Sequence, residues 1–296
     1  MMQQTISQEK RSKKPNTQWA LVWRKLRRNK GAMVGLAVVS IVTFIALTAP
    51  LFLDYYGDVI GMNIPNRLQS PSLAYPFGTD ELGRNMFIRI LWGSRYSLLI
   101  GFSSVGVALI IGVSLGAFAG FYGGNTEDLI MRATDIFDAV PGLLLGAVIM
   151  ASLGAGLNNL ILALGLASIP QFVRITRAAV LTVRDQEYVE ASWVIGLRAP
   201  EIVFRHVLPN CLSPIIVLST LQVAQNIIAA AAMSFLGLGV PAPNPEWGAL
   251  LSAGRGFMRT HGYLTLFPGL AIMVVVLALN LLGDGLRDAL DPKNNR

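Results

Sequence analysis

Residues 139–173 read AVPGLLLGAVIMASLGAGLNNLILALGLASIPQFV, a stretch of 35 residues without a charged side chain. A single helix of this length would extend about 52 Å, whereas the hydrocarbon core of a bilayer is about 30 Å thick. The stretch must therefore fold back on itself, and the segment GAGLNN at 154–159 is the natural turn. It predicts two membrane-spanning helices that run in opposite directions.

Four further uncharged intervals predict one membrane-spanning helix each. They are residues 31–53, 96–126, 206–245 and 260–283. Only 14% of the chain is charged, whereas soluble domains carry about 25%. Backbone polar groups in lipid must be satisfied within helices or closed barrels. We therefore expect an all-α membrane protein with six transmembrane helices.

The positive charges predict the orientation of the chain. Residues 1–30 hold nine Lys or Arg and one acidic residue, Glu9, so this tail carries a charge of +8 and the rest of the chain −1, which gives the net charge of +7. With the N-terminus in the cytoplasm, eighteen Lys and Arg lie inside and six outside, as the positive-inside rule requires. Both termini are then cytoplasmic. Residues 31–53 exceed the apolar core of a signal peptide, about 7 to 15 residues, and are expected to stay as an anchor.

The expected organisation is a single membrane domain with terminal and external additions. Residues 1–30 form a cytoplasmic basic tail, 31–53 the first transmembrane helix and 54–95 an external segment. Residues 96–285 form a five-helix core with a cytoplasmic segment at 185–209, and residues 286–296 form a cytoplasmic C-terminus. The basic charge is confined to the tail, which argues against nucleic acid as a partner.

Several enzyme and carrier classes lack support in this sequence. It has no GxxxxGK[ST] phosphate-binding loop and no HExxH zinc motif. One cysteine, Cys211, and two histidines, His206 and His261, offer no convincing metal site. No ionisable residue falls near the middle of a predicted span, where ion-coupled carriers place such groups. We therefore expect no enzymatic activity, no cofactor in this chain, and energy supplied by another polypeptide.

Residues 185–210 read DQEYVEASWVIGLRAPEIVFRHVLPN and predict two short helices on the cytoplasmic face. Residues 186–195 suit the first helix, Gly196 suits the left-handed residue that ends it, and Pro200 suits the first turn of the second. One face of the first helix could enter a groove on a partner protein, and lying on lipid is the alternative. This face consists of Tyr188, Ala191, Ser192 and Ile195.

Four motifs carry a family resemblance. Glu190-Ala191-Ser192, followed by Gly196 and then Leu208-Pro209, resembles the EAA signature of permease subunits of bacterial ABC importers, with serine in the third position. The other stretches are similar to the dipeptide, oligopeptide and nickel permease branch. They are FGTDELGRN at 77–85, with Asn85 where the family usually has Asp, FLGLG at 235–239 with PEWG at 245–248, and GDGLRDALDP at 283–292.

The resemblance implies a type I ABC importer permease fold in the bacterial inner membrane, as the second permease of a pair. The partners it implies are a second permease subunit, cytoplasmic ATPase subunits that bind ATP and Mg, an external substrate-binding protein, and membrane lipid. The EAA segment would be the coupling helix that docks on the ATPase. In that role Glu190 would supply a polar contact, Ala191 close packing and Gly196 the turn.

Amide side chains on the last two spans are candidates for the substrate path. Gln222, Gln225 and Asn226 lie at i, i+3 and i+4 on one helical face, and Asn280 lies on the last span. Amides offer hydrogen-bond donors and acceptors without a charge. The same side chains can instead join membrane helices to one another. Both interpretations stay open at this point.

Short peptides are the expected substrate, because the chain offers few histidines for a path that carries nickel. Nickel or another small solute is the alternative substrate, and a self-sufficient secondary carrier is the rival class of protein. Four residues near the last external loop are predicted to face the binding protein, with an aromatic-belt role as the alternative for the tryptophan. They are Glu246, Trp247, Arg255 and Arg259.

Overall fold

Helices are the only regular secondary structure in residues 18–291, the part of the chain that the computed structural model describes. The outer parts of the expected basic tail and of the expected C-terminus, 1–17 and 292–296, lie outside these residues. The α-helices are α1 Gln18–Arg28, α2 Lys30–Phe52, α3 Met86–Ala108, α4 Ser114–Tyr122, α5 Gly124–Asp138, α6 Gly142–Leu153, α7 Leu157–Leu181, α8 Glu187–Val194, α9 Ala199–Ile202, α10 Leu212–Phe235, α11 Trp247–Gly254 and α12 Tyr263–Leu290.

Short π and 3₁₀ turns join several of these helices. A π turn at Leu109–Val113 links α3 to α4, and turns at Val203–Val207 and Leu208–Cys211 link α9 to α10. The loop between α2 and α3 holds turns at Tyr55–Val59 and Ile64–Asn66, and Arg255–Phe257 follows α11. As a result, α3 with α4 and α9 with α10 form two helical runs of 37 residues each.

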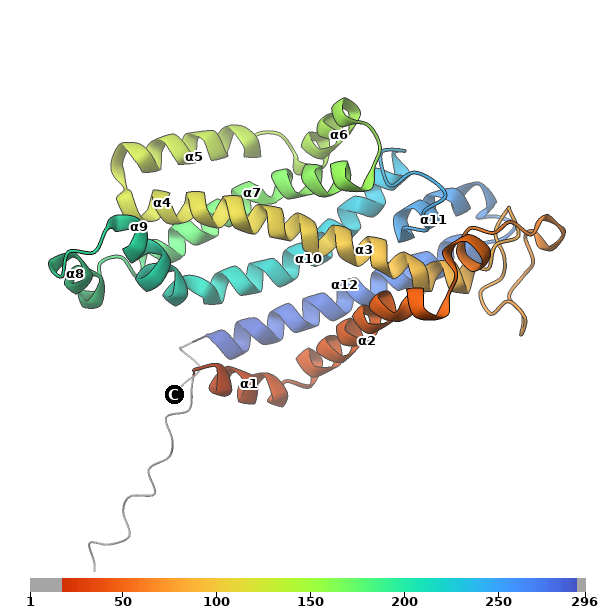
Figure 1. Ribbon diagram of the computed structural model, residues 1–296, viewed down its shortest axis with the longest axis horizontal. Coiled ribbons are helices and arrows are strands. Elements are labelled where there is room, and N and C mark those ends of the chain that lie inside the picture. The colour runs from red at the N-terminus through yellow and green to blue at the C-terminus, as the bar shows by residue number, and fades with distance from the viewer. Residues whose placement is uncertain (1–17, 292–296) are drawn as a thin grey trace, which may run out of the picture.

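The long helices run side by side along the bundle, with the short helices at its two ends (Figure 1). One end, which we call the α8 end, carries α1, α8, α9 and the last turn of α12. The opposite end, the α11 end, carries α11 and the loop between α2 and α3. At the α8 end Asn29 donates a hydrogen bond of 3.4 Å to Asp288, so the first and last described helices meet there.

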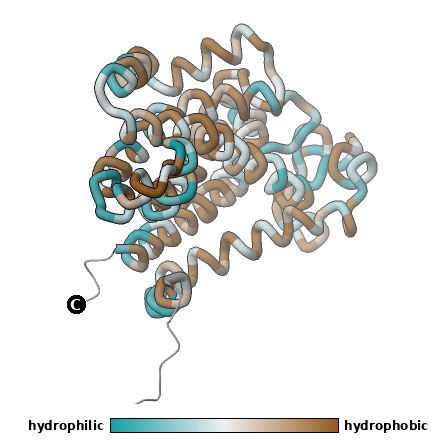
Figure 2. Tube along the Cα trace, turned by 60° about the vertical axis from the view of Figure 1, so that its left-hand side comes forward, coloured by the Kyte–Doolittle hydropathy of each residue, from teal (hydrophilic) through white to brown (hydrophobic). Residues whose placement is uncertain are grey.

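The lengths and polarity of the helices fit a membrane protein. Five helical runs are long and apolar enough to cross a membrane, and α5 with α6 makes a sixth if that bent pair is one span. Apolar residues follow the lengths of the helices, and hydrophilic residues gather at the two ends of the bundle (Figure 2). The expected all-α membrane fold is therefore confirmed.

The third span differs from the expectation. The residues that precede the uncharged stretch 139–173 form a helix of their own, α5, which is bent from α6 by 81°. Helix α6 has 12 residues and would extend about 18 Å, less than the thickness of the hydrocarbon core. Pro141 stands at the bend, where its missing N–H cannot continue α5. The turn after α6 lies where the sequence places it, with Gly154 at a φ of +85°.

The second span also begins earlier than its uncharged interval. Helix α3 starts at Met86, ten residues before position 96, and therefore contains Arg89 and Arg95. Each guanidinium has acceptors inside the protein: Arg89 pairs with Asp80, and Arg95 donates to the Ala46 carbonyl oxygen at 3.1 Å. An arginine can lie within a long apolar helix when a partner compensates its charge. A search for uncharged intervals does not find the start of such a helix.

Small residues allow the helices to approach closely. A Cβ atom added to Gly35 on α2 would lie 2.4 Å from the Ala278 carbonyl oxygen of α12, and one added to Gly116 on α4 would lie 2.4 Å from the Val173 carbonyl oxygen of α7. Such packing is how membrane helices associate without a hydrophobic driving force between them. It holds α2 against α12 and α4 against α7.

Candidate functional site

The segment between α7 and α10 forms two short helices joined by a tight turn. Helix α8 ends at Val194, Gly196 has a φ of +85°, and α9 begins after Arg198 with proline in its first turn. The Leu197 N–H donates to the Ser192 carbonyl oxygen at 3.2 Å, which closes the end of α8. The geometry is the one that the residue pattern predicts.

A hydrophobic cluster fixes this helix pair to the bundle. Val189 of α8 is 1% exposed and Ile202 of α9 is fully buried. Trp193 stacks on Phe121 of α4, with ring centroids 6.0 Å apart. The cluster also contains residues of α4, α7, α10 and the turns before α10: Ala117, Val180, Val203, Val207, Leu208, Cys211 and Ile215. A displacement of α8 must therefore move the ends of three long helices with it.

The exposed face of α8 is shifted from the predicted one. Ser192 is 4% exposed and its hydroxyl donates to the Tyr188 carbonyl oxygen at 2.8 Å, so this residue faces the protein and its assignment to the docking face is wrong. Val194 and Ile195 are 87% and 74% exposed. Partial burial raises the pKa of the Tyr188 hydroxyl, which keeps it protonated. The residues at i, i+3, i+4 and i+7 of the exposed face are Glu187, Glu190, Ala191 and Val194.

A polar cavity of about 290 Å³ lies between α6, α7 and α10 at mid-height of the bundle. Gln222 Nε2 donates to Ser168 Oγ at 3.1 Å and to Asn226 Oδ1 at 3.0 Å, and all three side chains are buried. Gln225 and Gln171 are exposed on the same cavity. The lining residues are Gly142, Leu143, Leu164, Ala167, Ser168, Gln171, Gln222, Gln225, Asn226 and Ala229.

The structure brings three of the four predicted path residues together and adds two. Asn280 is half-buried on α12 and does not line the cavity. Ser168 and Gln171, three residues apart on α7, face the α10 amides and were missed by sequence reasoning. Their spacing is the signal that could have found them, because residues at i and i+3 share a helix face.

One polar atom in the cavity wall lacks a partner. The Asn226 side chain is 3% exposed, and its Nδ2 group donates to no acceptor among the described residues. A buried amide donor without an acceptor costs about 1–3 kcal/mol. Nearly all buried polar groups in proteins are satisfied, so this donor is one of a few exceptions among the described residues.

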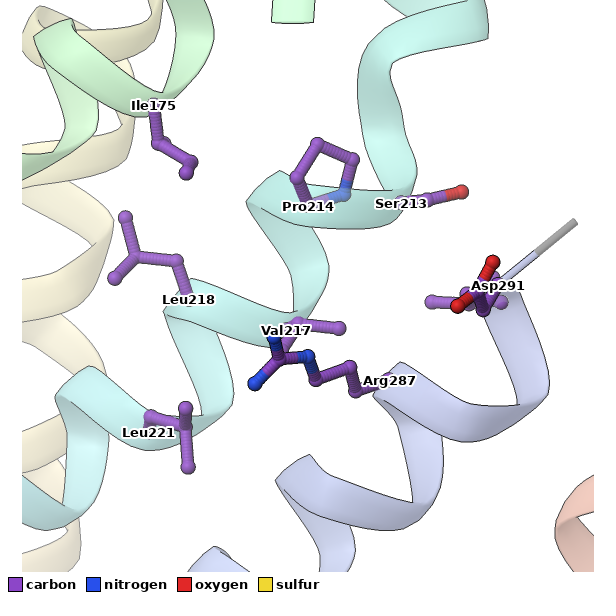
Figure 3. A pocket seen from close by; sticks show the side chains of 9 residues that line it. Ile175, Ser213, Pro214, Val217, Leu218, Leu221, Arg287 and Asp291 are labelled. Carbon is purple, nitrogen blue, oxygen red and sulfur yellow. The ribbon is translucent and has the colours of Figure 1, made fainter. Parts of the chain in front are cut away.

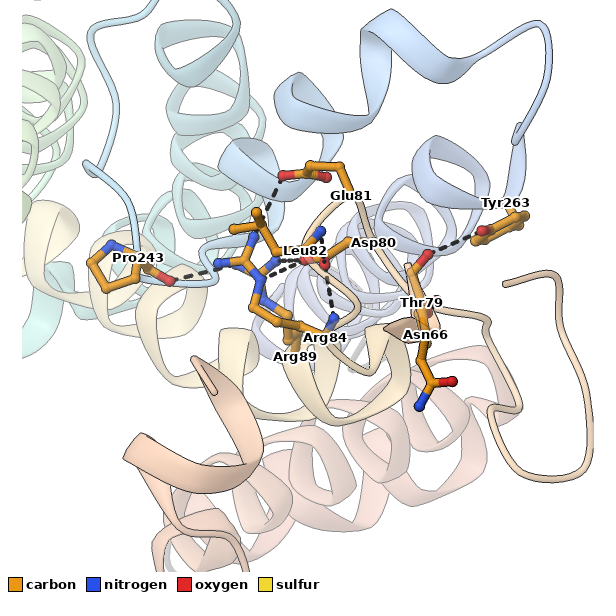
Figure 4. A network of polar contacts seen from close by, with 9 residues as sticks. All are labelled: Asn66, Thr79, Asp80, Glu81, Leu82, Arg84, Arg89, Pro243 and Tyr263. Atoms are coloured by element: carbon orange, nitrogen blue, oxygen red, sulfur yellow. Dashed lines mark hydrogen bonds and ion pairs between the residues drawn. The ribbon is translucent and has the colours of Figure 1, made fainter. Parts of the chain in front are cut away.

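Buried ion pairs organise the loop at the α11 end (Figure 4). Asp80 is 2% exposed and accepts from the Arg84 Nε at 2.7 Å and from Arg89. Arg89 also donates to the Pro243 carbonyl oxygen at 3.5 Å, which ties this loop to the segment before α11. Tyr263 at the start of α12 donates to the Thr79 carbonyl oxygen at 3.0 Å. The FGTDELGRN motif is thus a structural joint between α3, α11 and α12.

Glu246 is a buried carboxylate that begins α11. Its Oε1 accepts from the Ser97 hydroxyl at 3.2 Å and from the Gly248 N–H at 2.8 Å. Its Oε2 accepts from the Ser234 hydroxyl at 2.9 Å and from the Ala249 N–H at 2.8 Å. The side chain is 1% exposed. It therefore caps α11 and connects that helix to α3 and α10.

The predicted contact of Glu246 and Trp247 with an external protein is wrong, because both side chains are buried. Trp247 is 2% exposed and its Nε1 donates to the Ile90 carbonyl oxygen of α3 at 2.9 Å. An aromatic ring buried in this way does not face lipid headgroups either. Arg255 and Arg259 are exposed at the same end of the bundle.

Replacing Glu246 by glutamine is expected to destabilise the protein by about 2 kcal/mol, because the new amide would turn a donor toward one of the two backbone N–H groups. The expected loss is measured as a lower midpoint of thermal unfolding in detergent. Replacing exposed Glu187 by glutamine is the control and should change the midpoint little. Equal midpoints for the two variants would contradict the capping role.

The described residues offer no metal centre: residues 18–291 contain no group of three His, Cys, Asp or Glu side chains placed to hold an ion. The amides and hydroxyl of the polar cavity suit an uncharged or zwitterionic occupant with its own donors and acceptors.

Two sequence families match this chain. The family described as "Binding-protein-dependent transport system inner membrane component" matches residues 112–296. The family described as "N-terminal TM domain of oligopeptide transport permease C" matches residues 17–71.

Curated relatives match along nearly their whole length. The dipeptide transport system permease protein DppC of Alkalihalophilus pseudofirmus is 45% identical, with 93% of this chain and 90% of that protein covered. The glutathione transport system permease protein GsiD of Pectobacterium atrosepticum is 42% identical, with 96% and 94% covered. The oligopeptide transport system permease protein OppC of Bacillus subtilis is 40% identical, with 96% and 93% covered.

Among solved structures, a chain of the MetNI methionine ABC transporter in inward-facing conformations matches with a TM-score of 0.57 and 19% identity. The match covers 70% of this chain and 98% of that chain, and it supports the importer permease fold. The chain belongs to the family of binding-protein-dependent transport system inner membrane components and is a multi-pass permease of the bacterial inner membrane.

Proposed function

We propose that this chain is one of two permease chains of an ATP-driven importer for short peptides. Cytoplasmic ATPase subunits bind ATP and Mg and hydrolyse the nucleotide, and an external binding protein delivers the substrate. The α8 end, where α1 begins and α12 ends, faces the cytoplasm, as the distribution of Lys and Arg favours. The relatives named for dipeptide, oligopeptide and glutathione transport support peptides as the substrate class.

The exposed face of α8 is the observation that carries this proposal. Val194, Ala191, Glu187 and Glu190 form a mixed apolar and acidic face on a helix fixed to the bundle. Such a face suits a groove on a partner protein. The inner surface of the membrane is negatively charged and would repel two carboxylates, which argues against lipid as the occupant. In this proposal Glu190 supplies a polar contact to the ATPase and Ala191 allows close approach.

The anchoring of α8 and α9 supports a mechanical role. ATP binding closes the ATPase pair, and the docked helices follow as a rigid unit because the cluster around Ile202 and Val189 ties them to α4, α7 and α10. Interfaces that are packed in this way move as bodies rather than deform. The permease then alternates between two states, and ATP binding favours one of them.

The polar cavity is the proposed place of the peptide in transit. Gln222, Gln225 and Asn226 offer amide groups that match the backbone of a peptide. Nickel prefers imidazole, thiolate or carboxylate ligands, and none of the lining residues supplies one. A secondary carrier would couple transport to an ionisable group, and the cavity lining has none.

The test of the proposed function is co-purification through a tag on this chain, with the neighbouring genes expressed, followed by reconstitution into liposomes with the binding protein. We expect an associated ATPase activity and peptide uptake that requires ATP. Uptake that persists without ATP and collapses with an ionophore would instead identify a secondary carrier. Gentle extraction without any associated ATPase would also contradict the proposal.

Replacing Gln225 by leucine is expected to change substrate preference, because one hydrogen-bonding group at the cavity is lost. The loss of one such bond shifts the ratio of uptake rates for two peptides by about two- to tenfold. Asn280→Leu is the matched control, since Asn280 lies outside the cavity lining. If Asn280→Leu changes the substrate preference and Gln225→Leu does not, the substrate path lies along α12 and not along the polar cavity.

A further inference from the structure

A second cavity lies next to the polar cavity, on the side of the α8 end. It has a volume of about 460 Å³ and begins one helical turn below the first, because Ile175 follows Gln171 on α7 and Leu221 precedes Gln222 and Gln225 on α10. The lining residues are Ile175, Ser213, Pro214, Val217, Leu218, Leu221, Arg287, Leu290 and Asp291. Together the two cavities follow one face of α10 from mid-height to its first turn.

Most residues that line this lower cavity are apolar, and its polar lining residues are Ser213, Arg287 and Asp291. The Arg287 side chain extends from α12 toward Val217 and Leu221 of α10 (Figure 3). Arg174 and Arg177 on α7, at a similar height, are each paired with carboxylates of α5. Within residues 18–291, Arg287 has no such ion pair. Arg287 is exposed and lines the cavity together with Asp291, which lies one helical turn further along the chain.

We propose that Arg287 forms an exit subsite, which binds the carboxylate of a peptide that leaves the polar cavity. The inference rests on the proposed function and names the part of the substrate that the lower path recognises. A guanidinium binds a carboxylate through two parallel hydrogen bonds. Without it, the charged end of the peptide would have to pass the apolar walls uncompensated.

The dimensions fit this subsite. Pro214 and Gln225, at the two ends of the path on α10, are separated by about 16 Å at about 1.5 Å per residue. An extended peptide covers about 3.3–3.6 Å per residue. A peptide of four or five residues therefore spans the path, whereas a shorter one is passed from the amides to Arg287.

The experiment uses the whole complex with its binding protein in proteoliposomes, and compares trialanine with trialanine amide, which lacks the carboxylate. We expect Arg287→Gln to lower ATP-dependent uptake of trialanine about tenfold and of the amide less than twofold. For each peptide, the uptake rate of the variant is divided by that of the native complex. Because both complexes use the same binding protein, its preference for one peptide cancels in this ratio. Arg287→Lys should keep most of the trialanine uptake, and Arg28→Gln, an exposed arginine of α1 outside the cavity, should change neither peptide.

Four outcomes would overturn the inference or the proposed function on which it rests. An equal loss for both peptides would mean that Arg287 only stabilises the end of α12. A loss that depends on the phosphatidylglycerol content of the vesicles would assign the guanidinium to a lipid phosphate. Native uptake of trialanine that stays unchanged in Arg287→Gln would overturn the inference alone. Native complex that takes up neither peptide with ATP would overturn the proposed function itself.

Discussion

Replacement of Gly196 by valine is expected to abolish ATP-driven uptake while the chain stays in the membrane near its native level. Gly196 has a φ of +85°, and a Cβ atom added there would meet no atom within 4 Å. The free-energy cost of the substitution therefore comes from the backbone conformation and not from a clash, because a β-branched residue strongly disfavours positive φ. The turn between α8 and α9 would rearrange and the docking face would move, while the bundle keeps its packing. Uptake in proteoliposomes and the amount of co-purifying ATPase measure the effect.

Two substitutions serve as controls for this prediction. Gly196→Asn should keep most of the uptake, because asparagine tolerates the left-handed conformation better than other residues with a Cβ atom. A Cβ atom added to Gly256 would likewise meet no atom within 4 Å, but the φ of Gly256 is not positive, so Gly256→Val should be nearly neutral. Normal uptake by Gly196→Val would exclude the turn from coupling.

Replacement of Asp80 by asparagine is expected to lower the amount of folded protein severely. Asp80 accepts from the side chains of Arg84 and Arg89, which are 7% and 5% exposed, and from two backbone N–H groups of its own loop. Removing the charge leaves two buried guanidinium groups without their shared anion. Breaking a buried pair in this way costs about 3–5 kcal/mol. The midpoint of thermal unfolding in detergent and the yield of purified chain are the measurements.

Glu81→Gln is the matched control within the same loop. The Glu81 carboxylate lies 3.5 Å from Arg84 and its side chain is 33% exposed, so its loss should cost less than about 1 kcal/mol. Similar unfolding midpoints for the two variants would show that the buried ion pairs do not hold the loop. A large loss for Asp80→Asn alone supports the role of the motif as the joint between α3, α11 and α12.

The sequence predicted those features that depend on local pattern. The 35 uncharged residues required a turn, and the turn is at Gly154. The α8–α9 pair could be predicted from Gly196 and Pro200. Gly196 takes the positive φ that ends α8, and Pro200 fits the first turn of α9, so both act through their own backbone geometry.

Features that depend on partners distant in sequence were not predictable in this way. Arg89 in the first turn of α3 is paired with Asp80, and α5 is joined to α7 by the ion pair of Asp135 with Arg174. From the sequence, Glu246 is an acid in an external loop. In the structure it is buried and accepts hydrogen bonds from Ser97 and Ser234 of two other helices. Likewise, Ser168 and Gln171 line the cavity only because α7 packs beside α10, and this packing is not visible in the local sequence.

The close packing of α2 against α12 has a consequence for biosynthesis. Helix α2 is the first span to leave the ribosome, and about 210 residues separate its end from Tyr263, where its partner begins. At about 5–20 residues per second, the partner follows about 10–40 s later. During that interval the face of α2 that later packs against α12 must persist in lipid, and its run from Gly31 to Phe52 without a charge meets this requirement. The first span is thus suited to remain in the membrane until the last span is made.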